Sequence, residues 1–288
     1  MVNRRYIIGN THLEIKIDRD ILDDKRYLLF DDKTSKKADI FIEFNESESL
    51  PCILGANLVR EKDAFFEEYL IDGKYIRVYI HKYYLIPYAV LREVEENHFE
   101  CIYLKKYSNS YMDMNGIFSN IAFERVMIKN NNLVFHASLI DYKGKGILFS
   151  GPSGIGKSTQ ADLWEKYGEA EVINGDKVII NKIDDTWYGY GSPFAGSSSI
   201  YKNKRVKIDT IVFLEQANEQ CVITKVNGLE AVKKIFSQTI VNMWNEEFVT
   251  RVFNLVEVMV KDINILNMYA LKDEKSVDCL KMIIDEKR

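Results

Sequence analysis

Residues 146–160 read GILFSGPSGIGKSTQ, an apolar run that turns into glycine, serine and a single lysine. Residues 151–158 fit the pattern G-x-x-x-x-G-K-[ST] in full. Glycines let the backbone curl until several N–H groups point at one phosphate, and the helix that follows directs its positive N-terminal end at the same anion. Because the match lies between an apolar strand and a helical pattern, the sequence predicts a phosphate-binding loop.

The residue types in this loop predict separate contacts with a nucleoside triphosphate. Lys157 would reach the β- and γ-phosphates, and the hydroxyl of Ser158 would bind Mg²⁺. Backbone N–H groups would hold the remaining phosphate oxygens. The predicted nucleotide-binding residues are Gly151, Ser153, Gly154, Ile155, Gly156, Lys157, Ser158 and Thr159.

Magnesium needs a further oxygen ligand beyond Ser158, and Asp176 is the nearest candidate. It follows the first strand after the loop helix, in VINGDKVII. A strand beside the loop strand would bring its carboxylate to the phosphate end. The alternative interpretation is a turn aspartate in an Asn-Gly-Asp corner. Glu215, which ends TIVFLE, is the other candidate acid, or else a surface residue at the end of a strand.

His136 lies on the strand that precedes the loop strand, in LVFHASLID. Lys143-Gly144 predicts a turn between the two strands. If they pair, His136 is near the end of the hairpin where the glycine loop begins. There it would orient a carboxylate or help to take a proton from an attacking hydroxyl. A hydrogen-bonded core histidine is the alternative.

Two further stretches carry weaker signals. Residues 181–184 read NKID, which matches the guanine-reading motif N-K-x-D, but only one helix and one strand separate it from the loop, so we do not predict guanine recognition. Residues 188–198, YGYGSPFAGSS, predict either a mobile loop that contacts substrate or phosphate or a solvated connection. Ser192, Gly196 and Ser197 are the residues that would make such contacts.

The chain divides into two regions by pattern. Residues 1–110 are rich in β-branched and aromatic residues with partial alternation, and Asp72-Gly73 predicts a hairpin turn, so we expect a β-rich N-terminal domain without assigned chemistry. Residues 111–128 have helical spacing. Residues 111–288 are expected to form a nucleotide-binding domain of mixed strands and helices, which places the fold in the α/β class with some α+β character.

Composition bounds the function classes. The chain has 288 residues and a formal net charge of −4, which gives no electrostatic argument for nucleic acid or an acidic membrane as a partner. No apolar run is long enough to span a bilayer, and charge enters the N-terminus too early for a secretory signal, so a cytoplasmic protein is expected. The cysteines are scattered along the sequence, so we expect them to be small buried apolar residues rather than metal ligands or disulfide partners. They are Cys52, Cys101, Cys221 and Cys279.

Residues 136–180 resemble the kinase domain of HPr kinase/phosphorylase and its smaller relatives, which are structurally related to ATP-dependent phosphoenolpyruvate carboxykinase. A histidine ahead of a hairpin, the phosphate loop, one helix and an acidic strand end carry the resemblance, which covers roughly residues 112–285. It implies a P-loop serine kinase that uses ATP and Mg²⁺. It also implies that His136 supports catalysis, that Asp176 serves catalysis and binds metal, and that the acceptor is a peptide or protein hydroxyl.

The chain departs from that family at Gly175, where two adjacent aspartates are usual. Either Asp176 serves both metal and acceptor, or His136 acts as base, or the protein binds nucleotide without fast chemistry. The sequence therefore predicts a phosphotransferase, with a nucleotide-dependent binding module that presents a partner as the alternative. It predicts no particular oligomeric state.

Overall fold

The computed structural model describes residues 1–60 and 65–286, except for the side chains of residues 111 and 197. The chain forms two compact units, Met1–Asn130 and Asn131–Arg288. The division falls between residues 130 and 131 rather than near 110, because the helices after residue 110 pack within the N-terminal unit. Phe118 contacts the ring of Tyr6 with centroids 5.3 Å apart, and the N–H of Ala122 donates to the Tyr79 hydroxyl at 3.1 Å.

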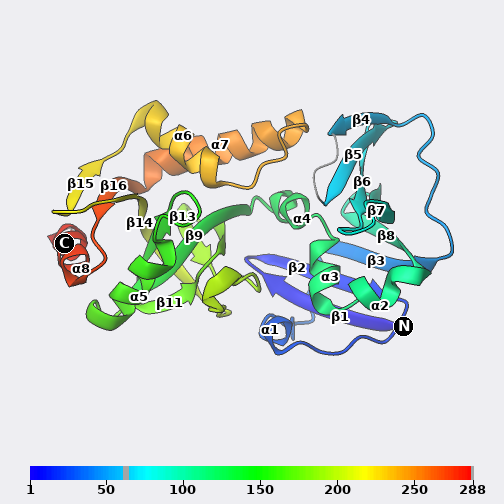
Figure 1. The fold of residues 1–288 in the computed structure, drawn as a ribbon, viewed down its shortest axis with the longest axis horizontal. Helices are drawn as coiled ribbons and strands as arrows, with labels where there is room; N and C mark the ends of the chain where they lie inside the picture. The colour runs from blue at the N-terminus through cyan, green and yellow to red at the C-terminus, as the bar shows by residue number, and fades with distance from the viewer. Residues whose placement is uncertain (61–64, 287–288) are drawn as a thin grey trace. The chain divides into compact units, whose positions relative to one another are not determined.

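The N-terminal unit is built on an eight-stranded sheet in the order β1-β2-β3-β8-β7-β6-β5-β4 (Figure 1). The β2–β3 and β3–β8 pairs are parallel and the others antiparallel. The predicted hairpin turn is confirmed, with Asp72 and Gly73 both at positive φ between paired strands. The strands are β1 Val2–Ile8, β2 Thr11–Ile17, β3 Ile40–Ser47, β4 Asn57–Arg60, β5 Phe66–Ile71, β6 Lys74–Ile80, β7 Pro87–Glu95 and β8 His98–Leu104.

Short helices complete this unit, and the predicted helical stretch of residues 111–128 forms two of them, α3 and α4. The helical pattern in residues 111–128 is interrupted, because Ala122 has a left-handed backbone with φ of 49° and its N–H bonds to the Tyr79 hydroxyl. A contact from a distant strand thus breaks a locally helical pattern. The helices are α1 Lys25–Leu28, η1 Lys105–Tyr107, α2 Ser108–Tyr111, α3 Met114–Ser119 and α4 Phe123–Lys129.

The C-terminal unit is built on an eight-stranded sheet in which two long strands, β9 and β14, change partners along their length. The first half of β9 pairs with β12, and its second half lies between β10 and β11. β14 pairs with β13 near its start and then runs parallel to β10 and β16. The strands are β9 Leu133–Tyr142, β10 Lys145–Ser150, β11 Glu171–Asn174, β12 Lys177–Ile183, β13 Thr186–Tyr190, β14 Arg205–Gln216, β15 Val222–Lys225 and β16 Asn264–Ala270.

Helices cover both faces of the β10-β14-β16 layer (Figure 1). On one face, Trp164 of α5 and Leu280 of α8 join Phe149 of β10 in a buried apolar cluster. Figure 1 shows α6 and α7 on the other side. The predicted mixture of strands and helices is confirmed, and the chain has a mixed α/β fold. The helices are α5 Lys157–Tyr167, η2 Gly196–Ser198, α6 Gly228–Gln238, α7 Glu246–Asp262 and α8 Glu274–Glu286.

The cysteines only partly follow the prediction. Cys101 is buried, but Cys52 is exposed, and Cys221 and Cys279 are half-buried. A hydrogen bond between Cys221 and Cys279 helps to raise the pKa of the Cys221 thiol, after burial as the main cause. Cys221 also packs against the buried apolar cluster that contains Trp164. None of the helices in the described ranges has the length and apolar character needed to cross a bilayer.

Candidate functional site

The glycine loop lies between β10 and α5, as the sequence predicted. Gly151 has φ of 141° and Gly156 has φ of 115°, values that L side chains rarely adopt, so both ends of the loop need glycine. Gly156 is also the N-cap of α5, and it supplies no side-chain cap to the first turn. The N–H groups of that turn therefore lack an intrahelical acceptor and point toward the loop.

Lys157, the first residue of α5, reaches back across the loop. Its Nζ donates to the carbonyl oxygens of Gly151 at 2.9 Å and Pro152 at 3.1 Å, and the residue is only 7% exposed. Burial lowers the pKa of Lys157, while the negative charge of Asp176 opposes that shift. A buried ammonium next to the uncapped N-terminus of α5 is a site that an anion would stabilise. The loop therefore fits a phosphate group on its own geometry.

The hydroxyl side chains of α5 begin beside Lys157. Ser158 is half-buried and Thr159 is exposed, whereas Ser153 and Gly154 lie on the exposed outside of the loop. In the described part of the chain, neither the Ser158 nor the Thr159 hydroxyl makes a side-chain hydrogen bond, so both can bind a ligand.

The described residues contain no group of three or more His, Cys, Asp or Glu side chains that could hold a metal ion. Mg²⁺ beside a triphosphate needs fewer protein ligands, because phosphate oxygens and waters fill most of its octahedral positions. One hydroxyl and one carboxylate, such as Ser158 and Asp176, fit that requirement.

His136 lies next to the start of the loop. The β9–β10 register pairs Ala137 with Ser150, and the Ser150 hydroxyl donates to the His136 carbonyl oxygen at 2.8 Å. This confirms the predicted placement at the end of the hairpin. The imidazole is not buried in the core, since its side chain is 36% exposed, and its Nε2 is 3.3 Å from Oδ1 of Asp176.

Asp176 lies at the break between β11 and β12. The expectation that its strand lies directly beside β10 is wrong, because β9 runs between them: the Ala137 N–H donates to the Asp176 carbonyl at 3.0 Å, and Lys177 pairs with His136. The hydrogen bond with His136 lowers the pKa of Asp176. Burial opposes this shift, and the charges of Lys177 and Lys157 add to it. The carboxylate is therefore ionised at neutral pH and lies near both His136 and Lys157.

Asn174 was not singled out by the sequence, which indicated only an Asn-Gly-Asp corner. Its amide is fully buried, and Oδ1 accepts from the Asp176 N–H at 3.0 Å. Its Nδ2 donates to the carbonyl oxygens of Ser192 at 3.0 Å and Phe194 at 3.2 Å. The bond to a backbone N–H two residues on is the local signal that could have identified it. The long-range bonds join Asp176 to residues 191–201, which we call the serine segment.

The serine segment packs directly on the backbone around Asp176. A Cβ placed on Gly175 would lie 1.9 Å from Oγ of Ser198, and one on Gly196 would lie 2.9 Å from Cβ and Cγ of Asp176. Ser192 is buried, and its hydroxyl donates to the Lys177 carbonyl at 2.5 Å, so it serves packing rather than ligand contact. The side chain of Ser197 lies outside the described residues.

Glu215, the alternative acid, has other partners. The parallel pairing of Ser150 with Phe213 carries β14 past the end of β10. Leu214 packs in the apolar cluster beneath α5, so the next residue, Glu215, points to the opposite face of the sheet. Its carboxylate accepts from Nδ2 of Asn267 at 2.9 Å and lies 3.9 Å from Nζ of Lys234. Of the two candidate acids, Asp176 is therefore the one that lies near His136 and Lys157.

The NKID stretch forms the end of β12 and the turn into β13. Asn181 is buried and its Nδ2 donates to the Asn131 carbonyl at 3.2 Å, while Nζ of Lys182 pairs with Asp262 at 2.9 Å. Asp184 lies in the turn with φ of 45°. The Asn181 and Lys182 side chains therefore connect the β12–β13 hairpin to the start of β9 and to the end of α7.

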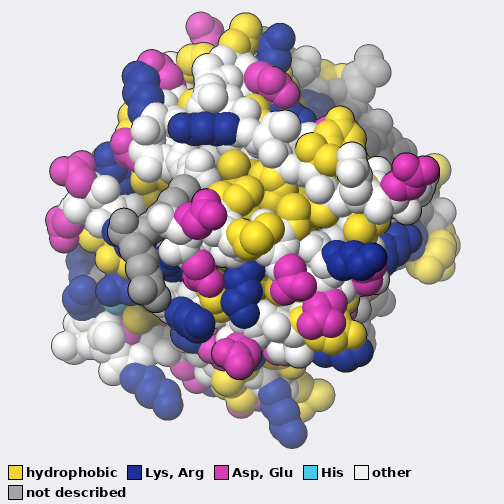
Figure 2. Space-filling model, turned by 90° about the vertical axis from the view of Figure 1, so that its left-hand side faces the viewer, with side chains coloured by type: hydrophobic (Ala, Val, Ile, Leu, Met, Phe, Trp, Pro, Cys, Tyr) yellow, Lys and Arg dark blue, Asp and Glu magenta, His cyan; other side chains and the backbone are white. Residues whose placement is uncertain are grey.

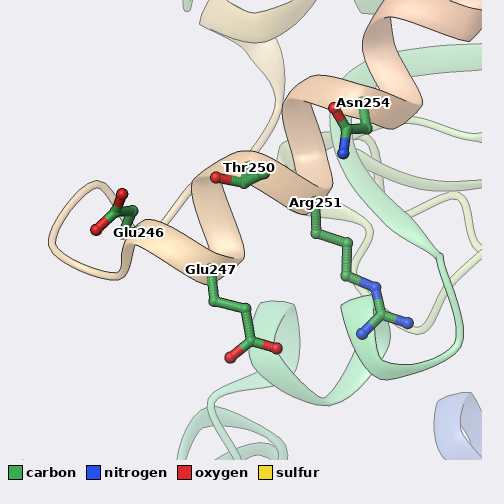
Figure 3. A pocket seen from close by; sticks show the side chains of 5 residues that line it. All are labelled: Glu246, Glu247, Thr250, Arg251 and Asn254. Carbon is green, nitrogen blue, oxygen red and sulfur yellow. The ribbon is translucent and has the colours of Figure 1, made fainter.

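Surface hollows of the C-terminal unit lie elsewhere. One of about 510 Å³ lies along α7, where Figure 3 shows Glu247 and Arg251 extending to the same side of the helix. Another, of about 760 Å³, lies along α8 and includes Lys281 and Met282. Figure 2 shows hydrophobic side chains gathered on one face, with charges of both signs interspersed around them. Neither hollow includes a residue of the glycine loop.

No family model and no curated protein matches the chain. Among solved structures, the Hpr(Ser) kinase/phosphatase from Coxiella burnetii is similar at 9% identity and a TM-score of 0.32. The alignment covers 54% of this chain and 95% of that one.

Proposed function

We propose that the chain is an ATP- and Mg²⁺-dependent phosphotransferase that moves the γ-phosphate to a hydroxyl, namely a serine of a peptide or protein. The observation that carries this proposal is that Lys157 lies inside the glycine loop while the His136–Asp176 pair lies next to it, with His136 on the neighbouring strand β9. A loop that only bound phosphate would need no ionised carboxylate beside a partly exposed imidazole. The resemblance of residues 136–180 to HPr kinases agrees with this assignment.

The residues divide the work of the transfer. Lys157 and the N–H groups of the loop would hold the β- and γ-phosphates, and Ser158 and Asp176 would hold Mg²⁺, which when bound neutralises charge that develops on the phosphate oxygens. The acceptor oxygen forms a bond to the γ-phosphorus as the bond from that phosphorus to the β–γ bridging oxygen breaks, and ADP leaves. The proton of the acceptor hydroxyl goes to the His136–Asp176 pair.

A binding titration with a matched control tests the first half of the proposal. Calorimetry of the full chain with a non-hydrolysable ATP analogue should give magnesium-dependent affinity, and Lys157→Ala should weaken it by about a hundredfold. Lys182→Ala removes a lysine that pairs with Asp262 on the surface of the same unit, and it should leave the affinity unchanged. Well-folded protein with no magnesium-dependent affinity for any nucleoside triphosphate would refute the proposal.

A second candidate function is supported by Gly175. Because the Ser198 side chain occupies the space beside this glycine, the site holds Asp176 without a second carboxylate at the adjacent position. A nucleotide-dependent binding module that presents a peptide or enzyme would need no more than this. Mass spectrometry after incubation with ATP, Mg²⁺ and a panel of serine peptides separates the two functions. A phosphorylated product that disappears in Asp176→Ala supports the kinase, and saturable nucleotide binding without product supports the module.

A further inference from the structure

Asn174 and the serine segment contact the Gly175–Asp176 turn at three points, in addition to the bond from the Ala137 N–H to the Asp176 carbonyl. Asn174 bonds to the Asp176 N–H, Gly196 lies against the Asp176 side chain, and Ser198 fills the space above Gly175. We propose that Asn174 and the serine segment form the positioning element of the Asp176 carboxylate, and that the size of Ser198 sets how closely this element approaches.

Asn174 joins the two parts of this element. Its side chain has no exposed surface, and its amide uses one acceptor and two donor positions on three different backbone groups. Two of those groups belong to the serine segment and the third is the N–H of Asp176. Moving the segment therefore breaks buried hydrogen bonds or moves Asp176 with it.

Further contacts keep the serine segment in place. The Ser198 hydroxyl donates to the Ala195 carbonyl at 2.7 Å and accepts from the Ile200 N–H at 3.2 Å, which fixes the turn over Gly175. The Lys202 N–H donates to the Ile173 carbonyl at 3.0 Å just beyond the segment. Nζ of Lys177 lies 4.8 Å from the ring centroid of Phe194. The segment is held at both ends, so a change of volume at Gly175 is not relieved by free movement.

The consequence for the site follows from the geometry of the metal ligand. The carboxylate of Asp176 lies 3.3 Å from Nε2 of His136 and near the charges of Lys157 and Lys177. A change in its direction would change how it meets a metal ion that Ser158 also binds. Residues that orient metal ligands typically change metal affinity by about 10- to 100-fold when they are replaced. The effect of the serine segment on metal binding by Asp176 rests on the proposed function, whereas the packing of the segment on Gly175 does not.

The test combines a substitution that introduces a steric clash, Gly175→Ala, with a second substitution that removes it, Ser198→Gly. Gly175→Ala places a methyl group against Ser198, and we expect it to weaken binding of a non-hydrolysable ATP analogue by about tenfold in Mg²⁺. Binding in EDTA should change less than about twofold, because the loop N–H groups and Lys157 are untouched. Ser198→Gly in the same chain should restore the magnesium-dependent affinity, and Ser199→Gly should not. If the contact between Gly175 and Ser198 only supported the fold, Gly175→Ala would lower the affinity for the ATP analogue in Mg²⁺ and in EDTA together.

Two outcomes overturn the inference: wild-type magnesium dependence in Gly175→Ala, or a loss that Ser198→Gly fails to repair. If Gly175→Ala does not fold, Asn174→Asp is the substitute, because it keeps the size of the side chain and removes both donors. It should weaken binding of the ATP analogue in Mg²⁺ more than in EDTA, and we call this difference the split. Asn181→Ala, a buried asparagine of β12 away from Asp176, is the control and should leave the split unchanged.

Thermal unfolding separates this inference from the proposed function. If the wild-type chain binds no nucleotide, the proposed function fails and the melting temperatures decide the packing claim. Gly175→Ala should lower the midpoint by at least roughly 2 °C, with recovery in the double variant. A midpoint unchanged by Gly175→Ala, or unrepaired by Ser198→Gly, refutes the packing claim itself.

Discussion

Each unit contains a cluster of opposite charges, and the two clusters differ in exposure. In the N-terminal unit, Arg77 donates from Nε to Glu68 at 2.5 Å and from Nη2 to Glu124 at 2.6 Å, and Arg125 lies 3.6 Å from Glu68. The Glu68 and Arg77 side chains are 0% and 4% exposed. In the C-terminal unit, the His136 and Asp176 side chains are 36% and 26% exposed.

This difference separates a structural cluster from a candidate site. The first cluster is closed, and the guanidinium of Arg77 also lies 4.0 Å from the ring centroid of Phe66. Burial raises the pKa of Glu68, whereas hydrogen bonding lowers the pKa of Asp176. A buried charge network has no room for a ligand and acts on stability. A half-exposed carboxylate next to a phosphate-type loop can act on a ligand.

The largest effect should come from opening the buried network. Arg77→Ala leaves the Glu68 carboxylate buried without its principal partner, and we expect a loss of about 3–5 kcal/mol in the free energy of unfolding of the N-terminal unit. Urea unfolding followed by circular dichroism measures it. Arg92→Ala in the same sheet removes a partly exposed pair with Glu100 and should cost about 1 kcal/mol or less. Equal losses in the two variants would mean that burial does not distinguish these pairs.

A change in the His136–Asp176 pair should lower activity rather than stability. Asp176→Asn keeps the shape of the side chain but removes the charge that would hold Mg²⁺, so phosphotransfer should fall about a hundredfold, or about 2.7 kcal/mol in transition-state stabilisation. The free energy of unfolding should change by less than about 1 kcal/mol, since the side chain is partly exposed. Steady-state kinetics and urea unfolding on one preparation give both numbers. A variant that loses stability instead of activity would place Asp176 in the structural class.

The pH dependence of stability should have opposite signs in the two clusters. Asp176 has a folded pKa below its ordinary 3.8, so its contribution is present above that pH and is lost as the pH falls through the folded pKa. Glu68 has a folded pKa above its ordinary 4.5, so the folded state retains the proton longer and stability falls as the pH rises from 4.5 through the folded value.

Urea unfolding between pH 3 and pH 7 tests these signs. Glu68→Gln should remove the decline above pH 4.5, and Asp176→Asn should reduce the rise near pH 3.8. Each variant is judged by the slope of its free energy of unfolding against pH, so an equal loss of stability at every pH in Glu68→Gln does not affect the result. Slopes of the same sign in both regions would contradict the opposite directions of the two pKa shifts.

The site was predictable where its signals are local. The glycine loop, the helix that begins at Lys157 and the hairpin that brings His136 to the loop all follow from residues close in sequence, because each pattern specifies its own turn or helix. The pairing of Asp176 with His136 joins residues that are farther apart in the sequence, and the break in VINGDKVII indicated which carboxylate it would involve.

The remainder depended on contacts between distant residues. The position of β9 between β10 and β12 is a matter of strand order, which alternation along one strand does not encode. Ala122 interrupts a helical pattern where its N–H donates to the hydroxyl of Tyr79, which is distant in sequence on β6. The pairing of Arg77 with Glu68 depends in the same way on the register of β5 and β6. Asn174 is a single buried amide whose importance appears only when the serine segment packs on it.

The smallest effect should come from Glu215→Gln, which sharpens the choice between the two candidate acids. The Glu215 side chain is 42% exposed, and its partners Asn267 and Lys234 lie on the face of the sheet away from α5. Asn267→Ala is the companion variant, because it removes the donor and leaves the carboxylate. We expect each change to alter phosphotransfer by less than about twofold and stability by about 0.5 kcal/mol or less. A hundredfold loss in Glu215→Gln at constant stability would transfer the metal role to Glu215, and Asp176 would then be a turn residue that positions His136.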